Sequence, residues 1–157
     1  MVRTSASFDL ITLGRVSMDL FSQSVGADFV DIKGFDASIG GSPSNIALGS
    51  SRLGMRVALL TAVSEDNVGK FVLHYLQNAG VETKYIPFKP NTRTGLAILG
   101  VQPPDRFPLV FYRDNPADIY LTKEDVLATP ITNSRALLLS GTALSRGSCR
   151  DATLFAA

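Results

Sequence analysis

The chain has 157 residues, of which 45% are hydrophobic and 18% charged, a composition that supports one hydrophobic core. No apolar run approaches the ~20 residues of a transmembrane helix. Fifteen Lys and Arg against fourteen Asp and Glu leave a formal charge of +1, which argues against nucleic acids and membranes as partners. One cysteine and one histidine exclude an intramolecular disulfide and a His-rich metal site.

From the amino end, strands and helices are predicted in alternation. The segment Met1–Asp9 lacks the order of a signal peptide, so we expect a cytoplasmic protein. Apolar runs typical of buried strands are Phe8–Leu13, Val57–Val63 and Thr83–Phe88. Alternating residues predict short, half-exposed strands at Val30–Lys33 and Phe35–Ile39. Two helices are predicted, one capped by Ser42 ahead of Pro43 and ending at Leu53, and an amphipathic one over Asp66–Ala79.

The second half of the chain predicts a hairpin, a short helix and another strand. The hairpin pairs Gly95–Val101 with Leu109–Arg113, the helix opens at a capping box in Thr122–Asp125, and the strand is Ala136–Leu139. The alternation of strands and helices implies a parallel sheet. The half-exposed segments suggest a small β-structure attached to that α/β core.

The carboxyl end of the chain has no helix stop signal. A helix from Ser148 would still be running at Ala157, with no glycine, proline or basic last turn to end it. This predicts either a frayed last turn or a fragment of a longer protein.

The turn from Gly40 to Asn45 is the most informative motif. Two glycines let a backbone pass close to a bound molecule, and the following helix directs free N–H groups to the same place. Asn45 adds a side-chain donor and acceptor. Such a turn suits a polyhydroxylated or anionic small molecule, and the alternative is a plain, well-capped connection. Neither a dinucleotide fingerprint nor a P-loop is present in the sequence.

Two more side chains are candidates for ligand binding. Asp19 follows a buried strand and could accept hydrogen bonds from ligand hydroxyls, or it could be a solvated loop carboxylate. Arg113 ends a strand and could grip a carboxylate with two hydrogen bonds, or it could pair with Asp114 or Asp118. Two residues are expected to be structural: an exposed His74 and a packed Cys149.

Together these residues resemble the ribokinase-like (PfkB) carbohydrate kinases. The family signature of two glycines, a small residue, Asn and another small residue is matched by Gly40–Ala47, with Ser64 where a glycine is usual. The resemblance runs from Phe8 onward. It is closest to the subgroup that phosphorylates 5-dehydro-2-deoxygluconate in inositol breakdown, through Pro103–Pro108, Phe111–Arg113, Asn115–Asp118 and Ser140–Ser145.

The resemblance implies a three-layer α/β/α fold with a mostly parallel sheet and a β lid, formed by residues 15–40 and 91–115. It implies substrate contacts from Asp19, Gly40, Gly41, Asn45 and Arg113, with Arg15 and Phe111 beside them. Asp19 and Asn45 would bind hydroxyls of a sugar acid, and Arg113 would face its acid end. The resemblance implies ATP and Mg²⁺ for the intact enzyme. It leaves undecided whether the enzyme also binds a monovalent cation and whether it forms a homodimer through the lid.

The family's catalytic base is the Asp of a Gly-x-Gly-Asp motif, which this sequence lacks and which we expect beyond Ala157. Residues 1–157 are therefore interpreted as the sugar-binding part of one kinase domain, inactive by itself. A fructokinase or a 2-keto-3-deoxygluconate kinase is the nearer alternative. A non-catalytic sugar-binding or interaction module is the alternative from another class, and a downstream reading frame with the motif would decide against it.

Overall fold

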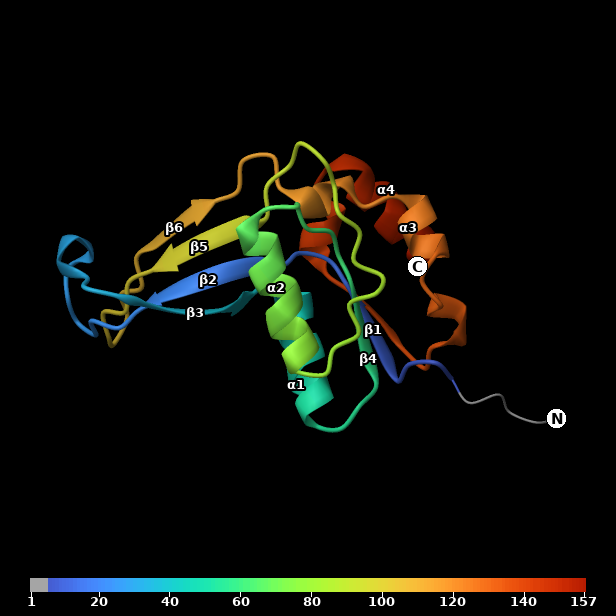
Figure 1. Ribbon diagram of the computed structural model, residues 1–157, viewed down its shortest axis with the longest axis horizontal. Helices are drawn as coiled ribbons and strands as arrows, with labels where there is room; N and C mark the ends of the chain where they lie inside the picture. Colours follow the sequence, from blue (N-terminus) through green and yellow to red (C-terminus); the bar gives the residue numbers. More distant parts are fainter. Residues whose placement is uncertain (1–5) are drawn as a thin grey trace.

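Two sheets form the framework of the computed structural model, which describes residues 6–157 (Figure 1). The first sheet is parallel, in the order β4-β1-β7, with bounds Leu10–Leu13 for β1, Val57–Leu60 for β4 and Leu137–Leu139 for β7. The segment Met1–Asp9, in which the sequence shows no signal-peptide pattern, lies only partly in the described structure, because residues 1–5 are outside it.

The second sheet is mixed and extends to one side of the first (Figure 1). Its order is β3-β2-β5-β6, with bounds Ser17–Ser22 for β2, Phe35–Gly40 for β3, Gly95–Leu99 for β5 and Leu109–Tyr112 for β6. β2 and β5 are parallel, whereas β3 and β6 pair antiparallel to their neighbours. The predicted hairpin is confirmed as β5 and β6.

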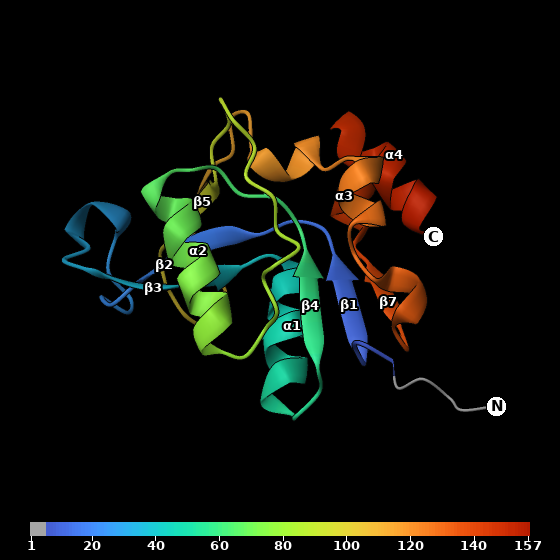
Figure 2. The same cartoon turned by 45° about the vertical axis from the view of Figure 1, so that its right-hand side comes forward.

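Helices cover both faces of the parallel sheet (Figure 2). They are α1 (Ser42–Arg52), α2 (Asn67–Asn78), α3 (Lys123–Leu127) and α4 (Gly147–Ala156). Within β4, Val57 and Leu59 pack toward α1 and α2, whereas Ala58 and Leu60 pack toward α3 and α4. Full burial of Leu59 and Leu60 contributes about 1.5–3 kcal/mol each. The expected three-layer α/β/α arrangement is therefore confirmed.

Helix α2 follows its predicted pattern closely. Val72 and Leu76 are fully buried, and His74 is exposed, where its Nε2 lies 2.9 Å from Nδ2 of Asn78. The carboxylate of Asp66 caps the helix by accepting the N–H of Gly69 at 2.6 Å. It also accepts a backbone N–H at the entry to β5, from Thr94 at 2.9 Å. The cap thus fastens α2 to the mixed sheet.

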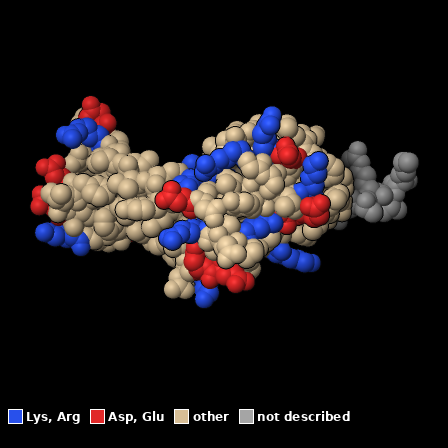
Figure 3. Space-filling view, turned by 90° about the horizontal axis from the view of Figure 1, so that it is seen from above, with Lys and Arg blue, Asp and Glu red and all other residues tan. Residues whose placement is uncertain are grey.

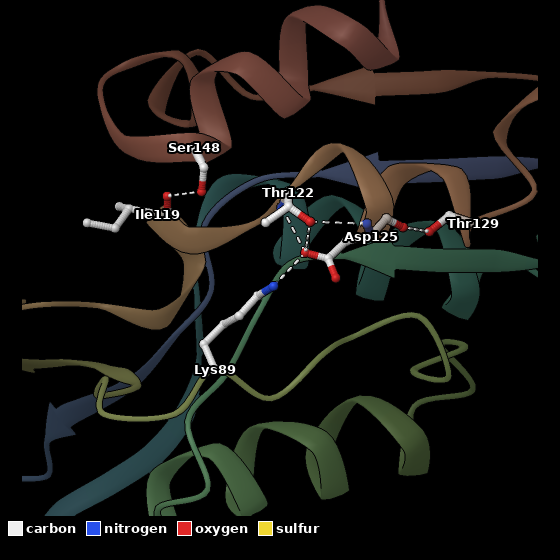
Figure 4. Close-up of polar contacts among 6 residues, drawn as sticks. All are labelled: Lys89, Ile119, Thr122, Asp125, Thr129 and Ser148. Atoms are coloured by element: carbon white, nitrogen blue, oxygen red, sulfur yellow. Dashed lines mark hydrogen bonds and ion pairs between the residues drawn. The ribbon is translucent and has the colours of Figure 1, made fainter.

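Helix α3 begins with the predicted capping box (Figure 4). The side chain of Thr122 accepts the N–H of Asp125, and Asp125 accepts the N–H of Thr122 at 2.8 Å. Lys89 approaches the same carboxylate at 2.6 Å, with both side chains less than one-fifth exposed. The ion pair ties the segment between α2 and β5 to the layer that holds α3 and α4.

Short 3-10 turns complete the chain: η1 (Phe29–Asp31), η2 (Ala117–Tyr120), η3 (Ile131–Asn133) and η4 (Gly141–Leu144). The first of them corrects a prediction, because Val30–Lys33 was expected to be a strand. Val30 is 91% exposed in η1, so its alternation has no sheet face to bury.

Two more predictions were wrong in detail. Thr83–Phe88 is not a strand, because the N–H of Ile86 turns back to the carbonyl of Thr83 and only isolated bridges reach β4 and Val63. Ser42 is not the cap of α1 but its first residue, and Gly41 is the cap with φ +98°. No helix among residues 6–157 is long and apolar enough to cross a membrane.

Candidate functional site

The candidate site begins on one face of the mixed sheet. Ser17 of β2 pairs with Gly40 and with Gly95, and Asp19 pairs with Ser38 and Ala97. Residues two apart on a strand share a face, and so do directly paired residues. Polar groups from β2 therefore stand among small neighbours, which leave room above the sheet for a bound molecule.

Asp19 lies within β2, so it is not the solvated loop carboxylate that the sequence left open as an alternative. Its carboxylate accepts a hydrogen bond from Oγ of Ser17 at 2.8 Å. The same carboxylate lies against Gly40, where an added Cβ would overlap it. Gly40 thus makes the space in which Asp19 is held, and the half-buried carboxylate keeps free lone pairs for hydroxyl groups.

The start of α1 lies against the connection between β1 and β2. A Cβ on Gly41 would overlap the backbone carbonyl of Arg15, and the φ of +98° also favours glycine there. Oγ of Ser44 is 2.6 Å from the carbonyl oxygen of Gly40, so it donates back to the turn. Asn45 donates its backbone N–H to Gly41 at 3.0 Å, and its side chain is exposed beside the turn.

An aromatic ring with two guanidinium groups beside it forms the other side of the site. Phe111 of β6 pairs with Ala97. Cζ of Arg15 lies 5.0 Å from the centre of the Phe111 ring, and Cζ of Arg113 lies 5.9 Å from it. These distances are within the range of cation–π attraction. Nη1 of Arg113 also reaches the space over Gly95.

The two guanidinium groups differ in their partners. Arg113 forms a bidentate ion pair with Asp118, with N–O distances of 2.9 and 2.6 Å and side chains 18% and 8% exposed. Of the predicted alternatives, the structure therefore shows pairing with Asp118. Nε of Arg15 is buried and has no hydrogen-bond partner among the described residues. The charge of Arg113 is therefore balanced by a carboxylate, whereas no carboxylate of residues 6–157 pairs with Arg15.

The structure brings the seven sequence-predicted residues together through contacts, from Asn45 and Gly41 to Arg15, Phe111 and Arg113, and from Gly40 to Asp19. Sequence reasoning missed Ser17 as the partner of Asp19. The alternation Ser17-Met-Asp19 ahead of Leu20 carries a signal for a strand with a polar face, but most of that strand lacks the β-branched residues that mark strands.

The model of the pfkB family of carbohydrate kinases matches residues 7–157. The chain belongs to this family. A 5-dehydro-2-deoxygluconokinase of Listeria monocytogenes is 36% identical to this pfkB chain over 148 residues, which cover 94% of the chain and 46% of the relative. The chain thus spans about half the length of the curated relatives it matches.

Solved structures share the fold of this pfkB chain. A fructokinase of Halothermothrix orenii is 28% identical with a TM-score of 0.78, covering 94% of the chain and 51% of the fructokinase. A putative ribokinase II of E. coli, solved with ATP and Mg²⁺, is 20% identical with a TM-score of 0.80, covering 94% and 47%. The ribokinase-like fold expected from the sequence is confirmed.

The described part of this pfkB chain does not fit a resident metal ion. No group of three His, Cys, Asp or Glu side chains in residues 6–157 is placed to hold one. The carboxylates nearest the site have other partners, since Asp19 accepts from Ser17 and Asp118 accepts from Arg113. We therefore assign no metal ligand and derive no metal-dependent step from these residues.

Among the groups with shifted pKa values in this pfkB chain are Cys149 and Asp9, neither of which is one of the proposed site residues. Burial raises the pKa of the Cys149 thiol, in agreement with its predicted packing role. Hydrogen bonds from the backbone N–H and the side chain of Arg56 lower the pKa of Asp9 to about 2.

The surface charges of both signs are interspersed over the face seen in Figure 3.

Proposed function

We propose that the protein carrying this chain is a sugar kinase that transfers the γ-phosphoryl group of ATP to the primary hydroxyl of 5-dehydro-2-deoxygluconate. The observation that carries the proposal is the convergence of a hydroxyl-binding side and a cationic side at one junction. Asp19 and Asn45 form the first, and the guanidinium groups of Arg15 and Arg113 flank Phe111 on the second. The names of relatives at 36% identity support the same substrate.

The proposed roles follow from the chemistry of each group. Asp19, oriented by Ser17, accepts hydrogen bonds from two hydroxyl groups of the sugar. Asn45 adds a donor and an acceptor, and the bare backbone at Gly40 and Gly41 lets the sugar approach closely. A molecule with hydroxyls at one end and a carboxylate at the other would bind in one orientation, because the site has opposite charges at its two sides.

We infer that ATP and Mg²⁺ serve the intact enzyme. The support is a neighbour of the same fold that was solved with both. Because neither a Gly-x-Gly-Asp sequence nor a metal cluster is found within residues 6–157, we assign no step of phosphoryl transfer to this chain. We expect the 157-residue chain alone to show no ATP-dependent turnover.

The mixed sheet is proposed to act as a lid that excludes water from the bound sugar, since hydrolysis of ATP competes with transfer. The sheet face opposite to Asp19 carries apolar side chains that include Phe35, Val110 and Tyr112, which are 38%, 40% and 55% exposed. These support a homodimer contact through the lid, which sedimentation velocity would test. A monomer at micromolar concentration would refute the contact.

The experiment that tests the function is a coupled ATP assay on the full-length protein with a panel of sugars and sugar acids. We expect the highest kcat/KM with 5-dehydro-2-deoxygluconate. A preference for fructose would favour a fructokinase, a reading that the 28% identical structure supports. A preference for 2-keto-3-deoxygluconate would favour that kinase, and sugar binding without turnover by the full-length protein would favour a non-catalytic module.

A further inference from the structure

The two guanidinium groups beside Phe111 differ in their ability to bind an anion. Both lie within 6 Å of the same ring, so either could reach an anion bound over it. Their surroundings differ, however, and a carboxylate binds most strongly to the cation whose charge and N–H donors are not already engaged.

Arg113 has its charge balanced within the chain. The two N–H groups that form its terminal edge are engaged by Asp118, at 2.9 and 2.6 Å. The Asp118 side chain is only 8% exposed, so little water screens its charge. A second carboxylate placed against Arg113 would face a like charge at close range, which opposes its binding.

Arg15 has the opposite situation. Its Nε is buried without a partner, and no carboxylate of residues 6–157 lies within ion-pair distance of its guanidinium group. The Nη groups of the same guanidinium also have no hydrogen-bond or ion-pair partner among residues 6–157, so they keep their donors for an incoming anion. The residue is held at both ends, because Cζ of Arg15 lies over the ring of Phe111 and its backbone carbonyl abuts Gly41.

We propose that Arg15, and not Arg113, pairs with the carboxylate of the substrate and so sets the preference for a sugar acid over a neutral sugar. This assignment rests on the proposed function. Arg113 is a positioning residue: its ion pair with Asp118 fastens the end of β6 to η2 and fixes Phe111, on which Arg15 lies. The sequence places Arg15 directly after Gly14, in the connection between the two sheets.

The test uses the full-length kinase and two substrates, the sugar acid and its analogue with the carboxylate reduced to a hydroxymethyl group. Arg15→Met keeps an unbranched apolar stem over Phe111 but removes the charge. We expect its kcat/KM for the acid to fall by about 10- to 150-fold, the range for a lost hydrogen bond to a charged group, with little change for the neutral analogue. Arg15→Lys should restore part of the selectivity.

Arg113→Met should lower kcat/KM for both substrates by similar factors, because a positioning residue affects the whole site. Arg106→Met is the matched control, since Arg106 is exposed at the tip of the mixed sheet and should leave both values unchanged. Thermal unfolding of each variant separates loss of folded protein from loss of selectivity.

The outcomes separate the two proposals. If the wild-type enzyme prefers neutral sugars, the proposed function fails and this assignment fails with it. If the wild type prefers the acid and Arg15→Met keeps that preference, the assignment alone is overturned. Loss of the preference in Arg113→Met but not in Arg15→Met would place the carboxylate at Arg113 instead.

Discussion

Replacing Gly40 with alanine should separate the stability of the fold from the binding of sugar. The three atoms nearest to an added Cβ all belong to the carboxyl group of Asp19. Because that group ends a flexible side chain, it can swing aside at about 0.5–1.5 kcal/mol for a less favourable rotamer. Losing the hydrogen bond from Ser17 costs about 0.5–1.5 kcal/mol more.

Alanine also restricts the unfolded chain, which returns about 0.4–1 kcal/mol of stability. The net destabilisation is then about 1 kcal/mol, or a fall in Tm of about 2–4 °C. The effect on function is larger. With Asp19 displaced, the hydrogen bonds that it is proposed to make to the sugar would be lost, and we expect binding to weaken by about 1–3 kcal/mol, which is roughly a 5- to 150-fold fall in kcat/KM.

The assay compares Tm and kcat/KM of the full-length enzyme for three alanine variants. Gly49→Ala is the control on the exposed side of α1, where an added Cβ meets nothing within 4 Å, and it should stabilise the protein slightly. Gly41→Ala meets the carbonyl of Arg15 at φ +98° and should lose more stability than Gly40→Ala. Unchanged kcat/KM in Gly40→Ala would refute the role given to Asp19.

Three further predictions test single carboxylate and amide groups. Asp19→Ala and Asn45→Ala should each weaken sugar binding by about 1–3 kcal/mol in titration calorimetry; unchanged affinity would return both to structural roles. Asp118→Asn should lower the free energy of unfolding in urea by about 2–3 kcal/mol, less than a fully buried pair because Arg113 is 18% exposed; an unchanged midpoint would contradict this. The pKa of Asp9 is lowered from 3.8 to about 2, so its stabilising contribution is complete above pH 3.8 and is lost as the pH falls toward 2. The free energy of unfolding of the Asp9→Asn variant should therefore fall less steeply with decreasing pH across that window. An acid-unfolding curve identical to that of the wild type would disprove the linkage.

The elements with a local pattern were predictable from the sequence. The stripe on α2 and the apolar runs of β1 and β4 depend on residues a few positions apart. The two strands are almost entirely buried, and the stripe buries Val72 and Leu76 with its other members half-buried. The capping box at Thr122 is equally local. Strand β2 was missed because its existence depends on partners that lie far along the chain, such as Ala97 opposite Asp19.

The sequence could predict that the candidate residues lie close together, but not which of them pair with one another. Sequence placed Asp19, Asn45 and Arg113 near one ligand, yet it could not choose between Asp114 and Asp118 as the partner of Arg113. That choice depends on the turn into η2, where Asp118 is buried and Asp114 is exposed. Local residue types identify which groups can bind, and tertiary packing decides which of them are already engaged.

Three connections between the two sheets pass through residues of the candidate site. Arg15 lies in the link from β1 to β2, Gly41 is the single residue between β3 and α1, and Arg113 directly follows β6. The sheets share no strand, so a rotation of one against the other would twist these three links and the fourth one, which runs from β4 through α2 to β5. The residues proposed to contact the sugar therefore lie in links that such a rotation would twist, and we expect a substitution at any of the three positions to change affinity and opening together.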